Sequence, residues 1–143
     1  MIYLLSPDDF GFYKAIFGAT DVLAGRALIQ YISGSRIPLF DYSALGGGNT
    51  MAAMRGYPLN RFLDKGKFLI NVEYRFPIIW RPGGNIFIDA GTVWPSLGEL
   101  RLSRLRCDCG AGLRFYLADF CARVDVGFSR EGTGIYFEFG HIF

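Results

Sequence analysis

Hydrophobic and polar residues alternate with a period of two along most of this chain. The clearest case runs from Gly134 to the C-terminal Phe143, where one register is apolar and aromatic and the other is small or polar. A period of two is typical of a β-strand, because successive side chains point to opposite faces. The pattern predicts about seven antiparallel strands and no helix. The expected strands cover residues 12–19, 22–33, 67–78, 86–91, 108–117, 122–129 and 134–143.

The connections between these strands are short on one side and long on the other. The short ones lie near residues 20–21, 80–83 and 118–120, and the long ones cover 34–66 and 93–106; the connection at 130–133 is an exception, because it is short on the long side. Short periplasmic turns and long outer loops are typical of outer-membrane barrels. The pattern therefore predicts an antiparallel up-and-down transmembrane β-barrel segment, with a long extracellular loop at about residues 34–66.

Alternation alone does not say which register faces inward. A soluble barrel or sandwich would bury the apolar register and would give the same string of residues. Two features favour lipid contact for the apolar register: the polar register combines glycines with charges of both signs, and strands of about nine to twelve residues match a tilted bilayer crossing. A soluble β-sandwich binding module remains an alternative.

Composition narrows the functional classes. The chain has 143 residues, enough for one domain, and a net charge of +2 gives no reason to expect a nucleic-acid partner. It contains no run of about 18 apolar residues, so we expect no transmembrane helix, and residues 1–9 do not resemble a signal peptide. Cys107, Cys109 and Cys121 lack the spacing of a metal site. We expect no metal, cofactor or catalytic residue.

The long loop carries a candidate interaction. A loop of some thirty residues is too long to be a mere connector. Arg55 needs a partner if the loop folds inward, because a charge removed from water must be paired. Glu73 and Asp89 lie in the polar register of the next two strands, and one guanidinium can donate to two carboxylates. The alternative is a solvated Arg55 beside two unrelated wall charges.

Several segments resemble motifs of one family. Met54-Arg55-Gly56-Tyr57 resembles the [V/I/L]-R-G-[F/Y] motif in the lumen-inserted loop of BamA/TamA-type barrels, the bacterial surface antigen family. Residues 71–78 are similar to its E-[Y/F]-R-x-P strand, and residues 110–114 and 136–143 also fit. Its G-x-x-F-x-D-x-G strand motif is matched by Gly84, Phe87, Asp89 and Gly91.

The resemblance implies roles for these residues. It implies that Arg55, followed by Gly56 and Tyr57, holds the loop inside the barrel as a latch, with Glu73 and Asp89 as its receivers. It also implies that the terminal strand is a targeting signal read by the assembly machinery. The residues of that signal are Ile135, Phe137, Phe139 and Phe143.

The resemblance further implies a location, partners and an activity. Family members are sixteen-stranded barrels of the bacterial outer membrane that follow periplasmic POTRA domains. They insert or translocate client β-barrel proteins through a weak seam between the first and last strands, so the implied partners are the lipid bilayer, client barrels and assembly-machinery subunits. A free strand edge can template a further strand, which gives the seam a physical basis.

The chain matches only the last seven strands of such a barrel. Seven strands cannot readily close a barrel of this kind, so residues 1–143 are expected to be the C-terminal segment of a longer protein. A second functional alternative is the barrel anchor of a patatin-like phospholipase. The chain contains no G-x-S-x-G motif, and its single histidine, His141, ends an apolar register, so we do not expect an enzyme.

Overall fold

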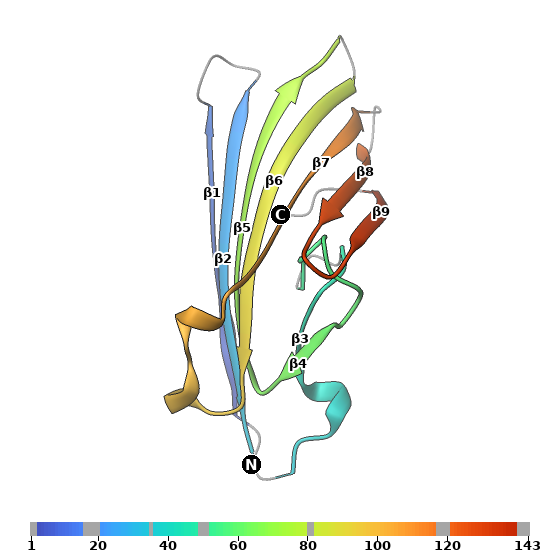
Figure 1. Cartoon of the computed structure of the whole chain (residues 1–143). Helices are drawn as coiled ribbons and strands as arrows, with labels where there is room; N and C mark the ends of the chain where they lie inside the picture. The colour runs from blue at the N-terminus through green and yellow to red at the C-terminus, as the bar shows by residue number, and fades with distance from the viewer. Residues whose placement is uncertain are drawn as a thin grey trace.

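The computed structural model describes residues 3–15, 21–34, 36–48, 52–79, 82–116 and 121–139. Seven of its strands pair antiparallel in the order β1-β2-β5-β6-β7-β8-β9, so that each is hydrogen-bonded to the next long strand of the chain (Figure 1). They are β1 (Tyr3–Ala15), β2 (Val22–Ser33), β5 (Gly66–Pro77), β6 (Pro82–Trp94), β7 (Arg106–Tyr116), β8 (Cys121–Phe128) and β9 (Thr133–Phe139). The fold is all-β, and the sheet is open, with β1 and β9 at its edges.

Two strands differ most from the predicted ones: β6 extends beyond the predicted 86–91 at both ends, and β1 begins much earlier than predicted. β1 begins at Tyr3 instead of Phe12, and its pairing with β2 shifts register between Leu5 and Asp8. An irregularity of this kind interrupts the period of two, which explains why the alternation did not reveal the first half of the strand. The predicted residues 16–19, 117 and 140–143 lie outside the described residues.

Three 3-10 turns depart from the expectation that the chain has no helix. They are η1 (Leu39–Asp41), η2 (Leu97–Glu99) and η3 (Leu102–Arg104), and all three lie in the two long connections. Turns of three residues are common as connectors and have no periodic signal long enough to read. No helix in the described part of the chain has the length and apolar character needed to cross a membrane.

The long connection between β2 and β5 folds back onto one face of the sheet, called here the inner face. It contains the short strands β3 (Ser43–Leu45) and β4 (Phe62–Asp64), which pair antiparallel and contact β5 and β6. An apolar cluster joins the loop to the sheet, since it combines residues of both. Its members are Leu45, Met54, Tyr57 and Phe62 of the loop with Leu28 of β2 and Leu69 of β5.

Burial across the sheet is inverted relative to a water-soluble protein. On β6, Ile86 and Ile88 are 52% and 59% exposed, whereas Asn85 and Asp89 on the inner face are almost fully buried. β5 and β8 show the same arrangement, with polar residues inward and apolar residues outward. A soluble β-sandwich would bury the opposite register between two facing sheets, and the described residues form one large sheet covered by its own loop.

The glycine that begins β5 makes room for a buried indole. Gly66 pairs with Trp94 of β6, and a Cβ added at Gly66 would overlap the indole ring. Gly66→Ala should therefore displace Trp94, at a cost of about 1–3 kcal/mol in the free energy of unfolding. Trp94 fluorescence in a Trp80→Phe background would report the displacement. Gly98→Ala is the control, because a Cβ there meets no atom within 4 Å; equal spectra for the two variants would contradict the prediction.

Candidate functional site: an arginine of the loop in the charged inner wall

Arg55 lies at a turn that the loop ties together with its own backbone. The N–H of Tyr57 donates to the carbonyl of Met54, at 3.1 Å, which places Arg55 and Gly56 at the centre of a β-turn. The N–H of Gly47 donates to the carbonyls of Met54 and Tyr57, at 3.1 and 3.0 Å. Gly47 has a φ of 93°, a conformation that favours glycine. The loop therefore presents Arg55 on a fixed turn.

The guanidinium of Arg55 contacts carboxylates from three strands. Its Nε and Nη2 donate to Oδ2 and Oδ1 of Asp89, at 2.9 and 2.8 Å, in a bidentate pair. Its Nη1 donates to Glu73, at 3.0 Å, and to Asp125, at 3.1 Å. The guanidinium carbon also lies 3.3 Å from the centroid of the Phe87 ring. Arg55, Glu73 and Asp89 are fully buried.

Further arginines balance the carboxylates on the wall. Glu73 also accepts hydrogen bonds from Nε of Arg75, at 2.8 Å, and from Arg114 of β7. Towards the sheet edge, Arg123 of β8 pairs with Glu138 of β9. Because Nε of Arg123 also lies 3.8 Å from Oδ2 of Asp125, the network extends from β5 to β9 and combines charges of both signs. Such pairing is required where charges are removed from water, because an unpaired buried charge is very costly.

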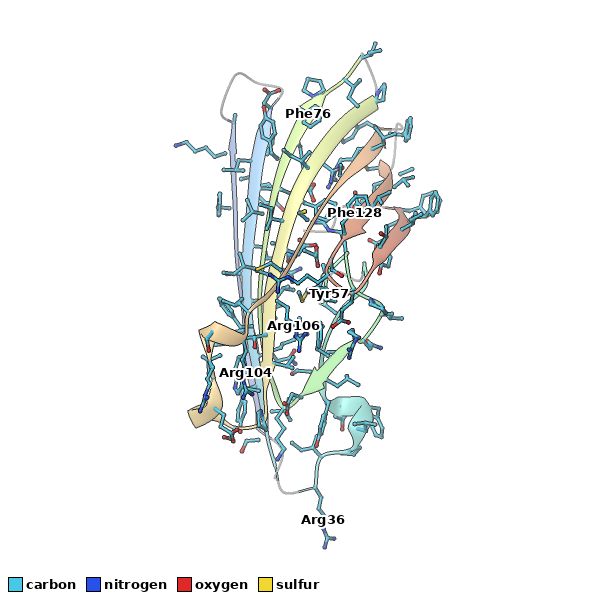
Figure 2. All side chains as sticks on the ribbon, in the orientation of Figure 1. Arg36, Tyr57, Phe76, Arg104, Arg106 and Phe128 are labelled. Atoms are coloured by element: carbon cyan, nitrogen blue, oxygen red, sulfur yellow. The ribbon has the colours of Figure 1, made fainter. Side chains whose placement is uncertain are left out.

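Neutral groups fix the loop backbone on both sides of the arginine. The side-chain amide of Asn71 donates to the carbonyl of Ala53 and to Asp89, both at 2.7 Å. The hydroxyl of Tyr136 on β9 donates to the carbonyl of Tyr57, at 2.8 Å. Figure 2 shows Tyr57 among the side chains that fill the space between the loop and the sheet. The loop is thus hydrogen-bonded to the wall through its backbone as well as through its charge.

The surroundings of the loop shift the pKa values of two of its side chains. Burial alone lowers the pKa of Arg55, but the hydrogen bond to Asp89 and the nearby carboxylates raise it above its ordinary value, so the guanidinium stays charged. Burial raises the pKa of the Tyr57 hydroxyl, and the charge of Asp108 raises it further. Tyr57 therefore stays neutral at physiological pH.

The structure brings together most of the residues singled out in the sequence. Phe87 lies under the guanidinium, Asp89 pairs with it, and Gly91 leaves room for Leu45 and Met54 of the loop. Gly84 lies elsewhere, next to the Phe76 ring.

The residues of the expected targeting signal lie apart from this site. Ile135, Phe137 and Phe139 are exposed along one face of β9, and Phe143 lies outside the described residues.

Sequence reasoning did not single out several contributors to this site. Asp125 stands in the polar register of its strand, and Asn71 and Arg114 stand in theirs, but nothing in a single strand shows which of its polar residues reaches the loop. That depends on the register between strands, which brings Asp125 of β8 within reach of the same guanidinium as Asp89 of β6. For Asp125 the available signal was the polar alternation of β8, whereas Asn71 and Arg114 lie within the segments 71–78 and 110–114 that resemble family motifs.

No ligand chemistry is evident in the described residues. They contain no group of three or more His, Cys, Asp or Glu side chains that could hold a metal ion. Cys107 and Cys109 are exposed on β7, Cys121 is buried, and all three are free thiols. The site is a set of ion pairs and hydrogen bonds between the 34–66 loop and the inner face of the sheet.

Comparison with protein families agrees with this architecture. Residues 8–143 match the model of the Omp85 superfamily domain, which is nearly the whole chain, so the chain belongs to the Omp85 superfamily. Proteins of this superfamily are associated with the bacterial outer membrane and generally insert or transport proteins without enzyme chemistry. A comparison with curated proteins finds no match to the chain.

The buried position of Arg55 predicts a large effect of its removal. Arg55→Ala leaves Glu73, Asp89 and Asp125 without their shared cation, so we expect a loss of about 3–5 kcal/mol in the free energy of unfolding. Arg61→Ala is the matched control, because Arg61 is half exposed and its pair with Glu131 should contribute less than about 1 kcal/mol. Equilibrium unfolding in detergent micelles would measure both, and equal losses would contradict the prediction.

Proposed function

We propose that this chain is the C-terminal barrel segment of an outer-membrane protein assembly or insertion factor. In this proposal its seven long strands are the last seven of a sixteen-stranded barrel. The inner face of the sheet lines the lumen, and the 34–66 loop enters that lumen from the extracellular side. The partners are the lipid bilayer, client β-barrel proteins and subunits of the assembly machinery.

The observation that carries the proposal is the inverted burial of the sheet. A wall with apolar side chains outward and paired charges inward suits a protein surrounded by lipid and filled with polar groups. The membership of the Omp85 superfamily adds support, since it connects this wall with outer-membrane protein insertion and transport.

Within this function, we assign Arg55 the role of a latch. Its bidentate pair with Asp89 and its bond to Glu73 support that role, because together they hold the loop turn against two neighbouring strands. Gly56 and Tyr57 complete the turn. A latch of this kind keeps a long loop in one position, whereas a loop attached only at its two ends would sample many positions.

The terminal strand has two roles in the proposal. Its exposed face, with Ile135, Phe137 and Phe139, is a targeting signal that continues to Phe143. Its outer edge is one side of the seam where a client strand can pair, since β9 is an edge of the described sheet. Edge strands offer unpaired N–H and C=O groups, and in lipid no water competes for them.

The latch predicts a defect in assembly when Arg55 is removed. In the complete protein that carries this segment, Arg55→Ala should lower the rate of client barrel insertion into lipid vesicles by about tenfold or more, because the loop leaves its place on the wall. Heat-modifiable migration of the inserted client measures the rate. Arg36→Ala, at an exposed arginine of the same loop, should retain most of the activity, and full activity of Arg55→Ala would refute the role of Arg55.

The membrane assignment predicts where a new charge is tolerated. Ile88→Arg places a charge on the outward face of β6 and should cost about 2–4 kcal/mol of stability in a bilayer if the position lies near the midplane. Leu63→Arg, on the exposed side of the loop, should cost less than about 1 kcal/mol. Unfolding titrations in lipid vesicles compare the two, and a harmless Ile88→Arg would argue against a lipid-facing wall.

A further inference from the structure

We infer that the loop turn braces the C-terminal hairpin β8–β9, so that the position of the edge strand depends on whether the loop is seated. This inference rests on the proposed function and deepens it: the latch would regulate the edge to which a client strand adds. Four features of the loop and the hairpin carry it.

The first feature is a row of glycines that crosses three strands at one height. Phe87 of β6 pairs with Gly110 of β7, Gly110 with Gly127 of β8, and Gly127 with Gly134 of β9. Three successive partners without side chains leave a trough in the inner face. Strand backbone forms the floor of this trough. The trough leads from the Phe87 ring, which lies under the Arg55 guanidinium, to the edge strand β9.

The second feature is that the loop turn occupies this trough. A Cβ added at Gly127 would overlap the carbonyl group of Arg55 and would come within 2.6 Å of the amide nitrogen of Gly56. A Cβ added at Gly134 would overlap the carbonyl oxygen of Arg55. The turn is therefore in direct contact with the backbone of both strands of the hairpin, and a methyl group at either glycine would push it away.

The third feature is a set of polar bonds between the loop and the hairpin. Arg55 donates to Asp125 of β8, and the hydroxyl of Tyr136 on β9 donates to the carbonyl of Tyr57, at 3.1 and 2.8 Å. Nearer the turn of the hairpin, Nε of Arg61 donates to Glu131, at 2.7 Å. Each element of the hairpin, its two strands and its turn, is thus bonded to the loop.

The fourth feature is the limited support that the hairpin has elsewhere. In the described sheet, β8 pairs with β7 and with β9, and β9 pairs with β8 alone. The same guanidinium that bonds β8 is anchored on β5 and β6 through Glu73 and Asp89. The loop therefore connects the hairpin to the middle of the sheet without passing through β7. Its release would leave the pairing of β8 with β7 and the hydrogen bond that the Asn85 amide of β6 donates to Asp125, at 3.2 Å.

The test follows the backbone of β9 directly. Hydrogen exchange of the β8–β9 amides, measured on the complete protein in lipid bilayers, reports how often the hairpin opens. Tyr136→Phe removes one bond to the loop without changing volume and should raise exchange in β9 about threefold to tenfold. The matched control is Tyr74→Phe, which removes a hydrogen bond to Asp21 away from the loop and should leave β9 unchanged.

A stronger variant addresses the trough itself. Gly127→Ala should raise exchange in β8 and β9 by more than tenfold and should also raise it in residues 52–57 of the loop. Gly11→Ala is its control, because a Cβ on that strand glycine lies no closer than 3.8 Å to its nearest neighbour, the carbonyl oxygen of Gly25. If Tyr136→Phe and Gly127→Ala change exchange in the loop but leave β9 as in the parent protein, the brace does not exist.

A reversible disulfide between the loop and β9 tests the brace separately from the assembly function. A Cβ at Gly48 would lie 2.8 Å from Cγ of Tyr136, so Gly48→Cys with Tyr136→Cys is placed to form a disulfide in a background with Cys107, Cys109 and Cys121 changed to serine. Oxidation should slow β9 exchange and client insertion by at least fivefold, and reduction should restore both. Unchanged β9 exchange on oxidation would overturn the brace. If exchange responds but neither the reduced nor the parent protein inserts any client, the brace stands and the proposed function fails.

Discussion

A guanidinium buried among carboxylates is stable because the opposite charges compensate one another, and this compensation organises the part of the inner face around Arg55. Arg55 brings one positive charge to a wall where Glu73, Asp89 and Asp125 converge. Arg75 and Arg114 balance the remaining charge of Glu73. The loop is therefore a structural component of the wall, because without it Asp89 would lose the arginine that it pairs with, whereas Glu73 and Asp125 would keep theirs.

This compensation also explains the apolar contacts of the loop. The Arg55 guanidinium reaches the carboxylates only if the loop turn is held against the inner face. An apolar cluster holds it there, in which Leu45, Met54 and Phe62 of the loop pack on Leu28 and Leu69 of the sheet. Apolar packing positions the loop, and the ion pairs determine its register on the wall. The two kinds of interaction have separate places in the structure: the cluster lies over β2 and β5, and the charges spread from β5 towards β9.

How far the sequence could predict this structure depended on the range of each interaction. Alternation is local, so it predicted the limits of β2 and the polar register that holds Glu73 and Asp89. It did not reveal the first half of β1, where the pairing slips between Leu5 and Asp8. It also could not identify Asp125 or the glycines of the trough as contacts of the loop. Those contacts depend on the register between three neighbouring strands, which no single strand contains.

The distance along the chain between the partners of Arg55 has a consequence for the order of folding. Glu73 and Asp89 follow Arg55 by 18 and 34 residues, and Asp125 follows it by 70. Closing a longer loop costs more chain entropy, so the contacts with the β5–β6 hairpin form at lower cost than the contact with β8. We therefore expect the arginine to have its first two partners before the last hairpin pairs, so that the seated turn offers β8 and β9 a surface on which to align. In this sense the loop is an internal template: once it is seated, it determines where the last two strands can lie.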